Sequence, residues 1–330
     1  MKFQEFIGID VSKSHIDVFI YSKNKHAKFG NSQAGFKMLI AWIEQHVDCA
    51  AKEVLFAFEH TGLYSLPLSL FLHEGQYGFT LLPGLELKRS MGITRGKNDK
   101  DDAKRIAEYA YEKREKIKLY KMPSAIFLKL KRLLSYRERL VKERAAFKGR
   151  LKEYGIFLDQ EENNVLFESQ RRMNAHLSEE IKTIEKELYR LIKTDEKLAR
   201  QFNLIKTIKG VGPQTTLVMI VLTNGFTSFD KWRKFASYAG TAPFSNESGT
   251  FKGKTKISPL ANKRIKTLLS CCATSAKQFN PEMKMYYQRR IAEGKNEMST
   301  LNIIRNKLLA RIFASVQRGT PYVDTYRFAA

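Results

Sequence analysis

Apolar and polar residues alternate with two different periods in the first third of the chain. Residues 6–9 and 54–58 are apolar runs typical of buried strands, and 16–21 alternates polar and apolar residues as a half-buried strand does. Strands followed by alternating strands and helices predict a mixed α/β sheet over residues 1–115. The predicted strands lie at 6–10, 16–21, 27–29, 54–59 and 77–82. Helices are predicted at roughly 33–46 and 63–74, followed by basic helical segments from about 84 to 113.

The middle of the chain has a helical repeat. Arg137 and Arg144 fill two positions of an apolar pattern whose spacing alternates between four and three residues. Two long helices with a turn near 159–164 would form an antiparallel coiled-coil arm, which with its linkers spans 116–200. This arm would serve dimerisation or span nucleic acid; the alternative is a helical pair packed on its own domain. The apolar positions are Ile126, Leu130, Leu133, Leu140, Phe147, Leu151, Leu177, Ile181, Ile184, Leu188 and Leu191.

Residues 201–330 are predicted to be mostly helical, with a loop at roughly 240–262. The segment 205–213 places Gly210 and Gly212 between two apolar helices. Such a helix-hairpin-helix-like turn can hold a phosphate on its backbone N–H groups. A plain turn between helices explains the same residues.

Charge narrows the possible partners. The chain has 330 residues and a formal net charge of +24; residues 1–98 carry +2, and 99–240 and 241–330 carry +11 each. A basic body behind a near-neutral front predicts a polyanionic partner, nucleic acid first, with an affinity that falls with salt. A generally basic soluble protein is the alternative. The cysteines lack metal-ligand spacing, and neither a signal peptide nor a membrane-length apolar run is found, so we expect a cytoplasmic protein without a membrane partner.

Four carboxylates stand at the ends of predicted elements in the front domain. Asp10 and Glu59 end two predicted strands, and Asp99 and Asp102 begin a predicted helix, three residues apart and therefore on one face. Carboxylates suit Mg²⁺, and two such ions about 4 Å apart can serve phosphodiester cleavage. The four acids together predict a site for two magnesium ions. Taken singly, an acid at a helix start could equally complement the helix dipole.

Ser248 lies between Glu247 and Gly249 in the predicted loop, followed by a lysine-rich stretch. Serine is a weak nucleophile unless a base or a metal activates it, and no histidine lies nearby in the sequence. Spacing alone favours a solvated loop serine. The candidate nucleic-acid contacts of the whole chain are Lys97, Lys100, Gly210, Gly212, Lys252, Lys254, Lys256, Lys263 and Arg264.

Several motifs in a fixed order favour a catalytic role for Ser248 over a solvated loop serine. Together they resemble the DEDD transposases of insertion sequences, which are similar to Piv-type invertases and are also described as bridge-RNA-guided recombinases. The resemblance spans nearly the whole chain. It rests on Gly8-Ile9-Asp10-Val11-Ser12-Lys13, Phe58-Glu59-His60-Thr61-Gly62-Leu63-Tyr64, Asp99 through Asp102-Ala103, Ile208-Lys209-Gly210-Val211-Gly212, and Tyr238-Ala239-Gly240-Thr241-Ala242-Pro243 leading into Glu247-Ser248-Gly249.

The resemblance implies a RuvC-like (RNase H-like) domain at 1–115, whose DEDD ligands for Mg²⁺ are the four acids, and a transposase domain at 201–330. Ser248 would be the nucleophile of a transient phosphoserine link to DNA, and Ser245 is a nearby competitor. Donor and target DNA would be chosen by base pairing with a structured bridge RNA. A dimer or tetramer supported by the coiled coil would assemble the composite site.

Two other classes of function fit some of the same residues. One is a RuvC-like nuclease that uses a metal-bound water, in which Ser248 is only structural. The other is a non-catalytic nucleic-acid-binding protein, in which the acids cap helices. Formation of a covalent adduct between protein and DNA separates the recombinase from both.

Overall fold

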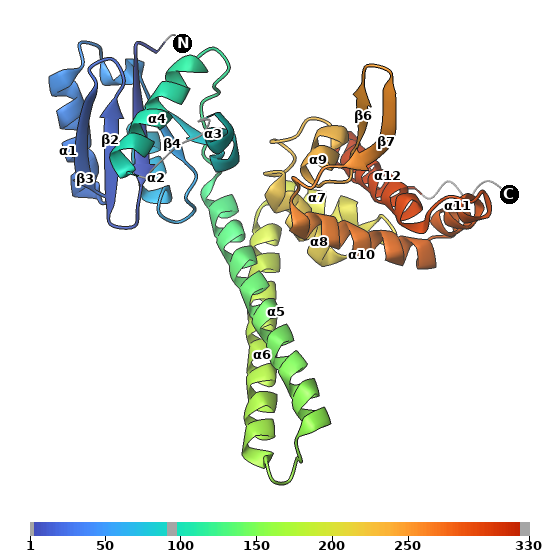
Figure 1. Cartoon of the computed structure of the whole chain (residues 1–330). Coiled ribbons are helices and arrows are strands. Elements are labelled where there is room, and N and C mark those ends of the chain that lie inside the picture. Colours follow the sequence, from blue (N-terminus) through green and yellow to red (C-terminus); the bar gives the residue numbers. More distant parts are fainter. Residues whose placement is uncertain (1–2, 91–97, 324–330) are drawn as a thin grey trace. The chain divides into compact units, whose positions relative to one another are not determined.

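The computed structural model describes residues 3–90 and 98–323. They form two compact units, the first ending at Met122 and the second beginning at Pro123 (Figure 1). Within the described ranges, no helix is long and apolar enough to span a membrane.

The first unit is a five-stranded mixed sheet in the order β3-β2-β1-β4-β5. The strands β1, β2 and β3 form an antiparallel meander, and β4 and β5 run parallel to β1. This confirms the mixed sheet predicted from the hydrophobic pattern. The elements are β1 (Glu5–Val11), β2 (His15–Ile20), β3 (Lys25–Gly30), α1 (Gln33–His46), a short 3₁₀ helix (Ala51–Glu53), β4 (Val54–Glu59), α2 (Leu66–Glu74), β5 (Gly78–Leu82), α3 (Gly84–Ser90) and α4 (Asp99–Glu112).

Helices cover both faces of this sheet (Figure 1). On one face, Ile7, Ile9 and Val18 pack with Phe36 and Leu39 of α1. The other face is covered by α4, and its core contains residues of opposite parity along the strands. Because successive strand residues point to opposite faces, β1 presents its even-numbered residues to α4.

Gly8 allows α4 to approach the sheet closely. A Cβ at Gly8 would overlap the carbonyl oxygen of Ala103, and it would also overlap the backbone nitrogen of Ala107. Both alanines are fully buried and lie on the α4 face that meets Phe19. Small residues on strand and helix therefore set the helix almost in backbone contact with β1.

The second unit is mostly helical. Its core surrounds α8, whose residues from Thr215 to Val221 are all buried, as expected for a helix that is apolar on every side. The elements are α5 (Ala125–Phe157), α6 (Asn164–Thr194), α7 (Glu196–Lys206), α8 (Pro213–Leu222), α9 (Trp232–Tyr238), β6 (Pro243–Ser248), β7 (Phe251–Ile257), α10 (Lys263–Phe279), α11 (Pro281–Ala292) and α12 (Glu297–Arg318).

The long helices α5 and α6 pack against each other (Figure 1). Near the start of α5 and the end of α6, Leu130 and Leu188 belong to the core of the second unit. Farther along the pair, Leu140, Leu177 and Ile181 form a separate small core. The pair is thus anchored in its own unit at one end and self-packed at the other. Its description as a coiled coil stays a prediction.

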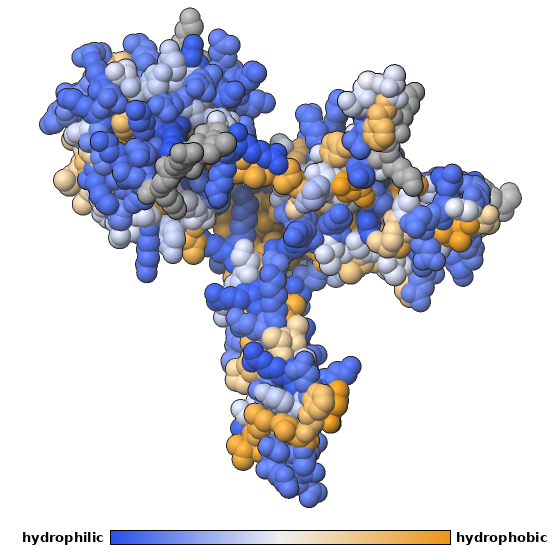
Figure 2. Space-filling view, viewed as in Figure 1, coloured by the Kyte–Doolittle hydropathy of each residue, from blue (hydrophilic) through white to orange (hydrophobic). Residues whose placement is uncertain are grey.

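A polar junction ties this pair to α8. Arg137 Nε donates a hydrogen bond to Glu185 Oε1 at 2.7 Å, and Gln214 Nε2 donates to the same oxygen at 2.9 Å. Near the far end of the arm, Figure 2 shows apolar patches among hydrophilic residues, and Phe157 and Val165 are each more than four-fifths exposed.

The segment predicted as a loop at 240–262 contains a β-hairpin instead. Strands β6 and β7 pair antiparallel around the two-residue turn Gly249-Thr250, with Ser248 opposite Phe251. Gly249 has a positive φ of 55°, which suits the first turn residue of a type II′ hairpin. The strand was missed because β6 is exposed at every residue and therefore has no apolar face to produce alternation.

Candidate carboxylate site and serine hairpin

Asp10 and Glu59 lie side by side at the ends of neighbouring strands. The parallel strands β1 and β4 pair Gly8 with Ala57 and Ile9 with Phe58, so the next residues of each strand are the two acids. Both have the strand parity of the face covered by α4. A Cβ at Gly84 would overlap Oε1 of Glu59, so the glycine that begins α3 leaves room for this carboxylate.

Asp99 and Asp102 lie in the first turn of α4, whose N-cap is Asn98. Asp102 Oδ1 accepts a hydrogen bond from Arg105 at 3.2 Å, and Asp99 Oδ2 lies 3.9 Å from Nε2 of His15. Negative side chains are favourable at this end of a helix, so the fold tolerates acids here before any metal binds.

One set of possible metal ligands comes within 4.8 Å of one another in the described part of the chain: His15, Asp17 and Asp99. Of the four predicted acids, only Asp99 belongs to this set. Asp10 adjoins the set because it pairs with Asp17 across β1 and β2, and Glu59 lies at the end of the strand next to Asp10. Asp102 follows Asp99 by three residues in the first turn of α4. The structure thus gathers the predicted acids on one side of the sheet, but it centres the closest contacts on two residues that sequence reasoning missed.

Asp17 is the most enclosed acid of this face. Its side chain is only 6% exposed, and its Oδ1 lies 2.9 Å from Nε2 of His26. Its Oδ2 lies 3.6 Å from the ammonium of Lys28 and 3.7 Å from Nε2 of His15. The available sequence signal was the polar position in the alternating strand 16–21, placed opposite Asp10 by the short turn between the two strands.

The helix that carries Asp99 and Asp102 is also tied to α3. Tyr109 of α4 donates a hydrogen bond to Glu86 Oε1 at 2.5 Å. Burial, together with this negatively charged partner, raises the pKa of Tyr109 to about 12. The phenol therefore stays protonated at neutral pH and keeps donating, which holds α4 and α3 together beside the acids.

Ser248 is the last residue of β6, next to the turn of the hairpin. All residues of β6 are exposed, and no atom lies within 4 Å of where a Cβ on Gly249 would be. Ser248 is therefore exposed at the end of a strand; its role as a nucleophile stays a prediction.

The base of the hairpin is fixed by a polar network with α12. Thr241 is fully buried; its hydroxyl donates to Asn306 Oδ1 at 2.9 Å. Its carbonyl oxygen accepts hydrogen bonds from Nδ2 of both Asn302 and Asn306, each at 2.9 Å. Sequence reasoning missed these asparagines, although their spacing of four residues on a helix puts both on one face.

The predicted nucleic-acid contacts differ in their surroundings. Lys100, Lys256 and Lys263 are exposed. Arg264 is half-buried and forms an ion pair of 3.0 Å with Glu138 of α5, and burial lowers its pKa. Lys97 lies outside the described residues, and Lys252 and Lys254 are described only as backbone of β7.

The two glycines of the turn before α8 have different surroundings. Gly210 has a φ of 94° and lies so close to α10 that a Cβ would overlap Ala276. Gly212 is the N-cap of α8. The nearby thiol of Cys272 donates a hydrogen bond to the Thr215 hydroxyl at 3.2 Å, and burial raises the pKa of this thiol. Packing on α10 accounts for part of this glycine pattern.

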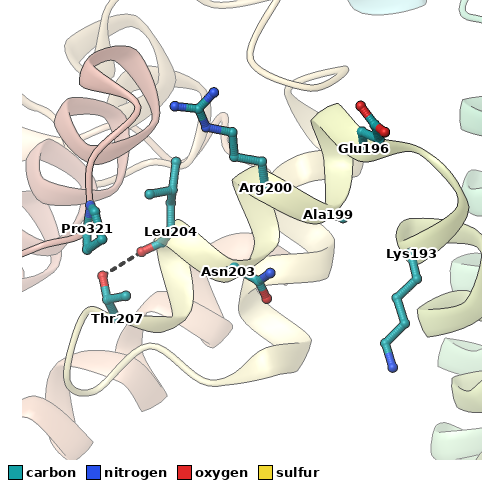
Figure 3. A pocket seen from close by; sticks show the side chains of 8 residues that line it. All are labelled: Lys193, Glu196, Ala199, Arg200, Asn203, Leu204, Thr207 and Pro321. Carbon is teal, nitrogen blue, oxygen red and sulfur yellow. Dashed lines mark hydrogen bonds between the residues drawn. The ribbon is translucent and has the colours of Figure 1, made fainter.

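A shallow pocket lies between the C-terminal end of α6, helix α7 and the segment after α12 (Figure 3). Lys193 and Arg200 are among its lining residues, and Arg200 donates a hydrogen bond to the carbonyl oxygen of Gly319 at 3.1 Å. None of the site residues predicted from the sequence lines this pocket.

Comparisons with known proteins identify the class. A transposase model of the IS110 DEDD type matches residues 7–160, and a model described as transposase IS116/IS110/IS902 family matches 202–288. Pilin gene-inverting proteins of Moraxella bovis and Moraxella lacunata are each 27% identical over 329 residues, covering 96% of this chain and 97% of theirs. An uncharacterized 43.6 kDa protein of insertion element IS110 from Streptomyces coelicolor is 29% identical over 119 residues, which are 36% of this chain and 29% of that protein.

The mixed sheet with its acidic face and these matches define a DNA transposase or recombinase. The chain belongs to the IS110 family of DEDD transposases.

Proposed function

We propose that this protein cuts and rejoins the DNA strands of an insertion sequence through a transient phosphoserine at Ser248. Asp10, Glu59, Asp99 and Asp102 would hold Mg²⁺, with two ions per site. The observation that carries the proposal is that Asp10 and Glu59 directly follow Ile9 and Phe58, the last paired residues of two adjacent parallel strands. Both acids have the strand parity of the sheet face covered by the helix that bears the other two acids.

The donor set fits the metal. Carboxylate oxygens are the ligands that Mg²⁺ prefers, and a helix N-terminus at the sheet edge can present two of them without further charge compensation. When bound, the ions would stabilise the negative charge that develops on the phosphodiester during cleavage.

The chemistry of the chain itself concerns Ser248. Its Oγ forms a bond to phosphorus while the bond from phosphorus to one sugar oxygen breaks. The proton lost from the serine hydroxyl is balanced by the proton that the released sugar hydroxyl gains. The reverse attack by another DNA hydroxyl would rejoin the strand with conservation of bond energy. No nucleoside triphosphate is then needed.

Partner selection is the second part of the proposal. A net charge of +24 favours binding to an extended polyanion such as nucleic acid. The family resemblance implies a structured guide RNA that pairs with donor and target DNA. A homo-oligomer would bring the serine of one copy to the carboxylates of the same or another copy. Sequencing the nucleic acid that copurifies with the protein tests the RNA.

The decisive experiment traps the covalent intermediate. The full-length protein is incubated with Mg²⁺, the copurified RNA and labelled donor and target DNA, and then run on a denaturing gel. We expect Ser248→Ala to form no adduct while binding RNA and DNA as the wild type does, because the side chain is exposed. Ser245→Ala, three residues earlier on the same exposed strand, is the matched control and should retain the adduct.

An adduct of unchanged yield in Ser248→Ala would refute the serine assignment. Cleavage without any adduct in the wild type would favour a nuclease that uses water. Mixing Ser248→Ala with Asp10→Asn then assigns the composite site: restored adduct means completion between copies, and an inactive mixture means completion within one copy.

A further inference from the structure

One ring nitrogen of His15 makes no hydrogen bond within the described part of the chain. Its Nε2 is buried and has no hydrogen-bond partner in the described part of the chain. Its Nδ1 lies 3.0 Å from the hydroxyl of Ser14. In the tautomer in which Nδ1–H donates to that hydroxyl, Nε2 presents its lone pair to the space between two carboxylates. A ligating histidine is usually oriented in this way, through a hydrogen bond from its other nitrogen.

The two carboxylates face this nitrogen at similar distances. Nε2 of His15 is 3.7 Å from Oδ2 of Asp17 and 3.9 Å from Oδ2 of Asp99. Both separations are too long for hydrogen bonds. They do match two ligands of one metal ion, because bonds of roughly 2.1 Å keep such ligand atoms within about 4.2 Å of each other.

The surroundings of Asp17 fit a ligand held in place before the ion arrives. His26 holds Oδ1 at 2.9 Å, which leaves Oδ2 directed toward His15. The ammonium of Lys28 is 3.6 Å from Oδ2, but the Lys28 side chain is 51% exposed. Lys28 can therefore turn to solvent when a divalent cation replaces its charge.

We propose that His15, Asp17 and Asp99 form a binding site for a first-row divalent transition-metal ion, which the site prefers over Mg²⁺. The reason is the nitrogen. Mg²⁺ favours all-oxygen coordination, whereas transition ions accept imidazole together with carboxylates. Mn²⁺, the weakest binder of the first-row series and yet compatible with carboxylates, is the most demanding probe.

This site rests on the proposed function in one respect, since it shares Asp99 with the magnesium ligands proposed above. It extends that function by adding His15 and Asp17 to the metal chemistry of the acidic face. Asp10 lies beside Asp17 in the sheet, so an ion on His15 would adjoin the site proposed for strand cleavage.

The test measures metal binding and does not depend on DNA cleavage. Mn²⁺ is titrated into the full-length protein, and bound ion is followed by the loss of its free electron-spin-resonance signal, alone and in competition with Mg²⁺. We expect wild-type protein to bind Mn²⁺ at least about tenfold more tightly than Mg²⁺, and His15→Gln to lose about tenfold in Mn²⁺ affinity. The spin echo of bound Mn²⁺ should show nitrogen coupling that His15→Gln abolishes.

His46→Gln is the matched control, because His46 lies on α1, which covers the opposite sheet face, and its ring bonds to the Trp42 carbonyl. It should leave affinity and nitrogen coupling unchanged. Asp17→Asn should weaken Mn²⁺ binding while keeping the coupling of any ion that remains, and thermal unfolding checks that each variant folds.

Three outcomes would overturn the site: no Mn²⁺ binding, bound Mn²⁺ without nitrogen coupling, or coupling that survives His15→Gln. Each can occur while the Ser248 adduct still forms with Mg²⁺, in which case the proposed function stands and only this site fails. If the adduct does not form but the nitrogen coupling is intact, the metal site stands and the proposed function fails.

Discussion

Asp10 and Glu59 lie on a sheet face that α4 covers, whereas Ser248 lies on a strand whose residues are all exposed. The acids are placed by buried neighbours on strand and helix. The serine is placed by one turn and by a polar network at the base of its hairpin. Groups that must hold a metal need fixed geometry, whereas a nucleophile that forms and breaks a bond to a large substrate needs access. The buried surroundings of the acids fix their geometry, and the exposed hairpin leaves the serine accessible to a large substrate.

The largest effect should come from neutralising one acid of the fixed region. Asp10→Asn should lower Mg²⁺-dependent DNA cleavage by at least about a thousandfold, because the amide oxygen is a poorer ligand and carries no charge. Cleavage of labelled DNA measures the loss, and a thermal melt checks folding. Asp101→Asn is the control: it neutralises an exposed acid in the same helical turn, outside the proposed ligand set, and should leave cleavage near the wild-type level. Full activity in Asp10→Asn would show that Asp10 is not a metal ligand, and the proposed difference between the two regions would fail.

The second prediction compares one glycine from each region. Gly8→Ala should destabilise the first unit by about 3 kcal/mol, the upper end of the usual cost of overpacking, because its Cβ meets backbone atoms of α4 that cannot move aside alone. Gly249→Ala meets no atom and strains only the positive φ of the turn, about 1–2 kcal/mol confined to the hairpin.

Urea unfolding followed by circular dichroism should therefore show a lower midpoint for Gly8→Ala and an unchanged one for Gly249→Ala. The adduct yield of Gly249→Ala should still fall, since the turn beside the serine is altered. Equal midpoints in the two variants would show that the α4 face is not the rigid region proposed here.

The smallest effect concerns the base of the hairpin. Asn306→Ala removes one donor from the Thr241 carbonyl and the acceptor of its hydroxyl, which should cost about 1–2 kcal/mol. Asn246→Ala, on the exposed strand, should change stability by less than about 0.5 kcal/mol. Denaturant unfolding compares the two, and a loss in Asn246→Ala as large as in Asn306→Ala would mean that the strand itself anchors the hairpin.

Sequence reasoning worked where burial imposes a period. The helix predicted at 33–46 lies at Gln33–His46, and the strand predicted at 54–59 lies at Val54–Glu59. The strand predicted at 6–10 extends by one residue at each end, from Glu5 to Val11. It failed at β6 and β7, because β6 is exposed at every residue and therefore produces no alternation of apolar and polar residues. There the only signal was Gly249, a residue that a two-residue turn requires.

The site was predicted in part for the same reason. Acids at element ends are visible in a sequence, but which of them touch depends on strand register. Asp17 reaches Asp10 only through the pairing of β1 with β2, and His15 reaches Asp99 only once α4 has packed on the sheet. Neither relation can be seen before the fold is known. The four acids were predicted as a magnesium site from their positions in the sequence, whereas the role of Ser248 as nucleophile came from the resemblance. Both assignments stay predictions.

The polar junction of Arg137, Glu185 and Gln214 has a consequence for how this family can change. It fixes the register of α5 against α6 at a point where the pair also meets α8. Beyond that point the two helices pack mainly on each other. Equal lengths of α5 and α6 can therefore be gained or lost at the far end without disturbing the core around α8, so the length of the arm can be selected independently of the chemistry.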